Sequence, residues 1–366
     1  MRTINNLITG TGLYWRKSAP MTFLQEIYRD IRSSQQNIRI MRFAVGITLA
    51  VVMSSAIDWP LSFLVPLLVS IMLAIPMPIP SLKAGLTNML HTLGAFFIGL
   101  LFTLFLLPFQ MAYFPMLGLV LFHLYYLLNR GGPFWFVLLS LLAVLVLPML
   151  GSTAEGLASG FAVGFILSGW VTVLMVWLAY LLVPDPVGTP ALPKKPGTRS
   201  GYHPLAAQVA LKSTIAILPV VMFFIVFDLT SQLLVMVFAA IFTLSPEVSK
   251  GRAAGTTSLK STLIGGTLAL FFYYLIVAVP QYHFFLVLIF LVALFIGSNI
   301  FSGKASAVYY GAAFSAFYVL INSNLAAGSE FTSAFFLRVL FIFMATVYVV
   351  LSLMVLERFW PQRAKQ

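Results

Sequence analysis

The chain has few charged residues and no cysteine. Of its 366 residues only 8% are charged, with 9 Asp and Glu against 21 Lys and Arg, and there are 4 His and 0 Cys. The absence of cysteine excludes disulfides and thiolate metal sites. The chain also lacks a P-loop, a glycine-rich dinucleotide-binding motif and paired histidines at zinc-binding spacing. We therefore expect a protein that is not an enzyme and that holds no metal or cofactor.

Hydrophobic residues make up 61% of the chain, and 34 of them are Phe. Apolar runs of about 20 residues, the length of a membrane-spanning helix, recur between Pro, Gly and single charges. The sequence therefore predicts an all-α polytopic membrane protein with about twelve transmembrane helices. The fourth, fifth, eighth and tenth spans are expected to be short. The expected spans are 40–57, 61–80, 85–107, 112–128, 133–150, 157–183, 205–227, 231–246, 256–279, 283–299, 305–321 and 333–356.

The chain looks like one unit written twice. Asp58 and Asp228 lie 170 residues apart, and the same offset links Arg42 to Lys212, Pro76 to Pro246 and Gly85 to Gly255. Such an internal repeat indicates duplication, and in an apolar chain it suggests a transporter or channel with its path between the halves. Six spans per copy is an even number, so the two fused six-helix repeats should be parallel.

Five segments follow from this reading. A basic segment, 1–36, contains an expected amphipathic helix on the membrane surface, although a stretch that only sets topology would look the same. The first repeat covers 37–183 and the second 205–358, and a Pro- and Gly-rich linker, 184–204, joins them. A basic tail, 359–366, ends the chain.

Charge is divided between alternate connections. With the N-terminus inside, the outer connections carry Asp58, Glu155, Asp228 and Glu330. The inner connections carry Lys83, Arg130, Lys194, Lys195, Arg199, Lys250, Arg252 and Lys304. This division follows the positive-inside rule and places both termini in the cytoplasm. It explains the net charge of +12 better than binding to nucleic acid, which we do not expect.

Several cations are candidates for an anion pathway, because a carboxylate that crosses hydrocarbon needs fixed positive charge. Arg42 and Lys212 begin equivalent spans, so they could form an inner anion-collecting ring, or they could snorkel and set topology. Arg338 lies several residues inside the last span, where an Arg usually faces the bundle or a water-filled cavity. The candidates for the pathway are Arg42, Lys212, Lys83, Arg252, Lys260 and Arg338.

Four ionisable groups are candidates for proton coupling: Asp58, Asp228, Glu247 and His91. The two aspartates end spans on the outer side, where protons would enter, but each could equally cap the next helix. His91 lies in the third span and is the best relay candidate among the histidines, although a helix-packing role fits it as well.

Prolines interrupt two spans near their inner ends. Pro76 and Pro78, with Pro80 beside them, lie at the inner end of the second span, and Pro246 lies at that of the eighth. Broken helices leave backbone groups that protein or water must satisfy, so such points often line a path. A simple helix stop is the alternative.

The order of these motifs along the chain resembles that of a known protein family. An early Arg in a span that ends in an acid (RFAVGITLAVVMSSAIDWP) precedes basic, glycine-containing stretches (SLKAGLTNMLHTLGAFFIG and SKGRAAGTTSLKSTLIGGTLAL). From about Ile38 to Leu356 this order resembles the fusaric acid resistance and aromatic acid exporter family. The family's basic signature is matched in part by Arg252, Gly255 and Thr256, whereas Gly85 of the first copy is followed by Leu86. The chain looks like a compact, membrane-only relative.

The resemblance implies export of small aromatic or other organic anions across a bacterial inner membrane, beside a periplasmic adaptor protein. Plant anion channels of the malate type look distantly similar, so a passive organic-anion channel is the first alternative. A non-transporting membrane assembly protein is the second. The expected partners are thus the anion, the adaptor and the bilayer, and a homo-oligomer is compatible with the sequence.

Overall fold

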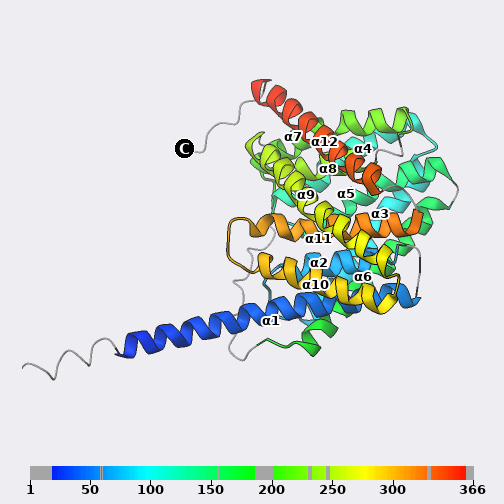
Figure 1. Ribbon diagram of the computed structural model, residues 1–366. Helices are drawn as coiled ribbons and strands as arrows, with labels where there is room; N and C mark the ends of the chain where they lie inside the picture. The colour runs from blue at the N-terminus through cyan, green and yellow to red at the C-terminus, as the bar shows by residue number, and fades with distance from the viewer. Residues whose placement is uncertain are drawn as a thin grey trace, which may run out of the picture.

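The structure, a computed structural model, describes residues 19–57, 59, 61–154, 156–185, 201–229, 233–244, 248–327 and 331–359. Over these residues all regular secondary structure is helical, which confirms the predicted all-α class (Figure 1). The helices are α1 (Ala19–Ile57), α2 (Leu64–Ala74), α3 (Leu82–Leu106), α4 (Gln110–Asn129), α5 (Phe134–Thr153), α6 (Leu157–Leu182), α7 (Pro204–Val226), α8 (Leu233–Phe242), α9 (Val248–Ala278), α10 (Tyr282–Ile300), α11 (Ala307–Ala327) and α12 (Phe331–Phe359).

Nine helices in the described part of the chain contain apolar stretches long enough to cross a membrane. Large apolar side chains also point away from the protein, as in Phe97, Phe105 and Met111, which are 55%, 68% and 95% exposed. An outward-facing apolar surface of this extent is expected where the surrounding solvent is lipid. The protein is therefore a multi-pass membrane protein.

The first helix differs from its prediction. We expected a surface helix that turns into the first span, but α1 is one continuous helix of 39 residues. Its first part extends beyond the bundle at the lower left of Figure 1. The end of the bundle from which it projects also holds the connection between α10 and α11, which carries Lys304. No Pro or Gly interrupts α1 until Gly46, so the backbone has no reason to bend at the membrane surface.

The short helices are α2 and α8, with 11 and 10 residues. The eighth span is short as predicted, but the fourth, fifth and tenth have 20, 20 and 19 residues. The second was expected to be longer. It ends at Ala74 because Ile75 is extended before Pro76, and the prolines after it cannot donate backbone hydrogen bonds.

Helix contacts come in matching pairs. In the first copy α1 contacts α2 and α6, and α3 contacts α5 and α6; in the second, α7 contacts α8 and α12, and α9 contacts α11 and α12. Between the copies, α1 with α10 matches α4 with α7, and α2 with α11 matches α5 with α8. Both equivalent glycines allow close packing, since a Cβ on Gly85 would overlap Trp177 and one on Gly255 would overlap Thr346.

The hydrophobic core is shared between the copies. One cluster joins α4 and α5 to α7, α8 and α12, and another joins α1, α2 and α6 to α9, α10 and α11. Each cluster therefore contains side chains from both halves of the sequence. The boundary between the two repeats in the sequence is therefore not a boundary in the packing. Much of the predicted linker lies outside the described residues.

Candidate functional site: buried cations of the two copies

Arg42 of α1 is buried, with 3% of its surface exposed. Its Nε donates to the Val183 carbonyl oxygen at 2.8 Å, and its second guanidinium nitrogen lies 2.6 Å from Asp185 Oδ1. The guanidinium also stacks on the Tyr180 ring, 3.8 Å from its centroid. The charge is thus neutralised by groups at and just beyond the end of α6. Asp185 and Tyr180 were not anticipated, since neither belongs to the repeated pattern that drew attention to Arg42.

The extended segment after α2 lies next to Arg42. The Tyr180 hydroxyl donates to the Met77 carbonyl oxygen at 2.5 Å, and Trp177 Nε1 donates to Pro80 at 3.0 Å. Pro76 and Met77, with Arg39 and Arg42, line a hollow of about 190 Å³. The break in the second span therefore leaves carbonyl groups that α6 satisfies, although Ile75, Pro76 and Met77 are themselves exposed.

Lys212 of α7 is the counterpart of Arg42, and its surroundings differ. Its side chain is 3% exposed, and its Nζ has no hydrogen-bond partner among the described residues. The next residue, Ser213, donates to the Thr243 carbonyl oxygen beyond the end of α8 at 2.7 Å, so Lys212 lies near that end. A buried ammonium group without a partner is costly, and an anionic ligand would offset that cost.

Arg338 of α12 is the second candidate cation with a buried nitrogen that has no hydrogen-bond partner among the described residues. It continues the face of α12 on which Ile342, Ala345 and Val349 are fully buried. Its Nε is buried without a hydrogen-bond partner in the part of the chain that the structure describes. Arg338 therefore faces the bundle, as its depth in the sequence predicted, and not the lipid.

The other candidate cations lie at the surface. Lys83 and Arg252 are exposed near the starts of α3 and α9. Lys260 is exposed too, and its Nζ lies 3.4 Å from the Tyr309 hydroxyl near the start of α11. Its contact with the start of α11 places Lys260 near a helix end, where a Lys can snorkel.

Asp228 is the one predicted aspartate that the structure describes; Asp58 and Glu247 lie outside the described residues, as does Pro246. Asp228 is exposed and left-handed, with φ of 49°. Its N–H and that of Leu229 donate to Ile225 and Phe224. These bonds form a Schellman motif, so Asp228 closes the preceding helix rather than starting the next one.

His91 lies inside the bundle with no carboxylate described beside it. Its Nδ1 is buried and has no hydrogen-bond partner among the described residues. Its ring packs against Phe136, with the centroids 5.6 Å apart. These contacts fit a packing role, and a proton relay through His91 stays a prediction.

The turn between α1 and α2 is held by a residue that the sequence did not single out. Ser168 is fully buried in α6; its hydroxyl donates to the Leu61 carbonyl oxygen at 2.9 Å and accepts from Trp59 Nε1 at 3.1 Å. Leu61 has φ of 67°, a left-handed conformation that costs about 1–2 kcal/mol for a residue with a side chain. Ser168 thus fixes a strained turn.

We expect Ser168→Ala to lower the free energy of unfolding by about 1–3 kcal/mol, since it leaves Trp59 Nε1 without its acceptor. Chemical unfolding in detergent micelles would measure the change. Ser159→Ala is the matched control, because Ser159 is exposed in the same helix and bonds only locally to Gly156. Equal effects of the two substitutions would show that the turn does not depend on Ser168.

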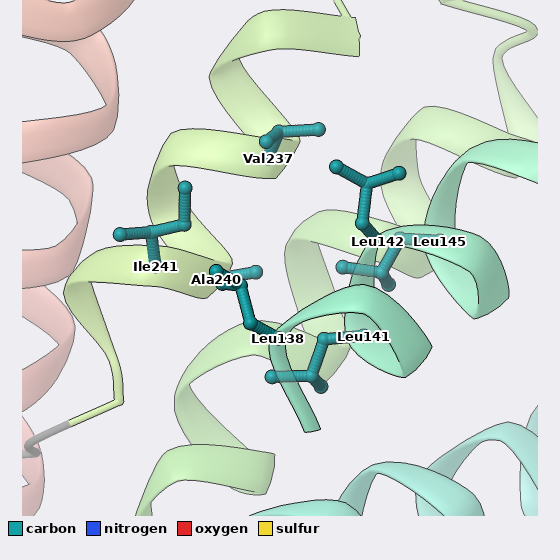
Figure 2. A pocket seen from close by; sticks show the side chains of 7 residues that line it. All are labelled: Leu138, Leu141, Leu142, Leu145, Val237, Ala240 and Ile241. Carbon is teal, nitrogen blue, oxygen red and sulfur yellow. The ribbon is translucent and has the colours of Figure 1, made fainter. Parts of the chain in front are cut away.

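A hollow of about 270 Å³ lies between α5 and α8, where the two copies meet. Figure 2 shows leucines of α5, among them Leu138 and Leu142, facing Val237 and Ile241 of α8. Every side chain around it is aliphatic, so it offers nothing to bind an anion. At this place the seam between the copies is not a polar path.

A larger groove, of about 600 Å³, runs between α7 and α12 of the second copy. Ile215 and Pro219 form one wall, and Tyr348 and Ser352 belong to the other. The Tyr348 hydroxyl crosses between the helices and donates to the Ala216 carbonyl oxygen at 2.8 Å. The walls of this groove are apolar apart from two hydroxyl groups. Its α7 residues follow Lys212 closely in the sequence.

Comparison with protein families gives one match. The model of DUF2955, described as a protein of unknown function, matches residues 39–179. This range begins inside α1 and ends inside α6, so the match covers the helices of the first copy. Comparison with curated proteins and with solved structures gives no match.

Proposed function

We propose that the protein transports small organic anions across a membrane. The observation that carries this proposal is Lys212, which is 3% exposed and whose Nζ has no partner among the described residues. The net cost of burying a charge falls when a counter-charge is brought to it, so a transient carboxylate is the natural ligand. Arg338 supports the proposal, because a second cation with a buried nitrogen faces the same bundle.

The equivalent cations of the two copies would then have different roles. Asp185 and the Val183 carbonyl already bind Arg42, which leaves it little capacity for an anion. Lys212, at the equivalent position, has no hydrogen-bond partner for its Nζ among the described residues, and an ammonium group can donate three hydrogen bonds. The symmetric ring predicted from the sequence becomes, in this proposal, one structural ion pair and one binding site.

Direction and energy source belong to the proposal as well. The resemblance to aromatic acid exporters supports proton-driven export from a bacterial cytoplasm, with both termini inside and a periplasmic adaptor as partner. Protons would then be carried by the groups predicted from the sequence. These are Asp58, Asp228, Glu247 and His91.

Accumulation of radiolabelled benzoate in cells, with and without the protein and a protonophore, tests the proposal. We expect lower accumulation in cells that hold the protein, and loss of this difference when the protonophore is added. Lys212→Gln should reduce protein-dependent flux at least about tenfold, since it removes one partner of a buried charge pair. Lys212→Arg should retain part of the flux.

Arg358→Gln is the matched control, because Arg358 is exposed in the last turn of α12 and its loss removes the same charge. Flux that follows the anion gradient and ignores the protonophore would identify a channel. If benzoate and other organic anions accumulate equally with and without the protein, transport is contradicted. The role in membrane assembly is then the remaining alternative.

A further inference from the structure

The groove between α7 and α12 opens toward the surroundings of the bundle. Leu351 and Val355 on its α12 wall are 57% and 55% exposed, and Ile215 on its α7 wall is 41% exposed. In a membrane protein such side chains meet lipid tails, so a molecule dissolved in the bilayer can reach the groove sideways. The space in it that a water-sized molecule can reach, about 310 Å³, lies at the lower end of the range of about 300–1,000 Å³ that holds one small ligand.

Lys212 continues the α7 face that lines this groove, one turn closer to the start of the helix, but is not itself among the lining residues. Positions 212, 215 and 219 share a helix face, because they are separated by three and four residues, and the last two line the groove. Lys212 nevertheless has only 3% of its surface exposed, so neighbouring groups cover its side chain there. Ser352 brings a buried hydroxyl to the opposite wall, where it interacts with the hydroxyl of Tyr348.

We propose that this groove binds a single-chain aliphatic carboxylate that enters from the bilayer. Its carboxylate pairs with Lys212 Nζ and accepts from the Ser352 hydroxyl, and its chain lies between α7 and α12. This inference rests on the proposed transport of organic anions and specifies the shape of the anion. Two-chain phospholipids are excluded by the size of the groove, although their phosphate could also attract Lys212.

Equilibrium binding of radiolabelled decanoate to the full chain in phosphatidylcholine nanodiscs tests the proposal. Lys212→Gln and Leu351→Trp should each raise Kd at least about tenfold, the first by removing the charge and the second by filling the groove. Lys212→Arg should restore binding. The matched control is Leu340→Trp, because Leu340 is 49% exposed on the same helix and does not line the groove.

Val355→Trp serves as a second filling variant if Leu351→Trp fails to fold, as judged by its thermal midpoint. Decanol should compete more weakly than decanoate, since it lacks the charge. Equal affinity in the wild type, Lys212→Gln and both filling variants would overturn the groove site. Displacement of decanoate by an equal concentration of phosphatidylglycerol would also overturn it and identify a lipid headgroup site.

The two proposals fail in different ways. If the groove variants leave decanoate binding unchanged while benzoate flux still requires Lys212, the groove inference is wrong and anion transport stands. If decanoate binds as expected but no organic anion moves in cells, the groove is supported and the transport function is wrong.

Discussion

Replacing Asp185 with alanine lowers the free energy of unfolding by about 3 kcal/mol, because it leaves the Arg42 guanidinium buried without its counter-charge. The side chains of Arg42 and Asp185 are 4% and 19% exposed, so water can replace the carboxylate only in part. The loss should therefore exceed that of an exposed ion pair, which contributes at most about 1 kcal/mol. Unfolding in mixed micelles would measure the difference from the wild type.

A double substitution separates the net contribution of the ion pair from the cost of leaving Arg42 buried without its counter-charge. Arg42→Met combined with Asp185→Leu should regain most of the lost stability, since apolar residues of similar size often replace a buried pair without loss. Lys304→Ala, at an exposed position in the α10–α11 connection, should change stability by less than about 0.5 kcal/mol. A loss for Asp185→Ala as small as that of Lys304→Ala would mean that Arg42 finds other partners.

Tyr125→Ala should cost about 3–5 kcal/mol, because it removes a fully buried aromatic ring from the cluster that joins the copies. The Tyr125 hydroxyl lies 2.9 Å from Thr243 Oγ1, so a residue of α4 in the first copy contacts the end of α8 in the second. Tyr125→Phe keeps the ring and should cost only about 1 kcal/mol for the lost hydrogen bond. Thermal unfolding in detergent would separate the two contributions.

Tyr202→Ala is the matched control for the loss of an aromatic ring. Tyr202 is 75% exposed, and its removal should change stability by no more than about 0.5 kcal/mol. If Tyr125→Ala and Tyr202→Ala unfold at the same temperature, the contact between α4 and α8 does not stabilise the protein.

The all-helical class and the duplication were predictable from sequence because they depend on composition and spacing. Long apolar runs can satisfy their backbone groups in lipid only as helices, and equivalent residues such as Gly85 and Gly255 recur at one offset. The depth of Arg338 also predicted that it faces the bundle. A charged group is costly to expose to lipid, so an Arg at this depth has few alternatives to facing the bundle.

The partners of Arg42 could not be predicted. Asp185 stands in a Pro-rich stretch that reads as a linker, and its distance from Arg42 in sequence gives no hint of contact. The roles of Ser168 and Tyr180 were missed for the same reason, since single polar residues in an apolar helix show no pattern until the fold is known. That Asp228 closes the preceding helix could not be read from the sequence, because an acid between two helices can close the first or open the second.

The reciprocal contacts between the copies are those that a two-fold homodimer makes. Where α1 meets α10, α4 meets α7, and where α2 meets α11, α5 meets α8. A one-copy ancestor would have formed both seams with a single set of residues, so any substitution would have altered the two together. Gene fusion removes that constraint. An arginine at one of two equivalent positions and a lysine at the other, with an ion pair described only for the arginine, is a difference that a fused chain can hold and a symmetric dimer cannot.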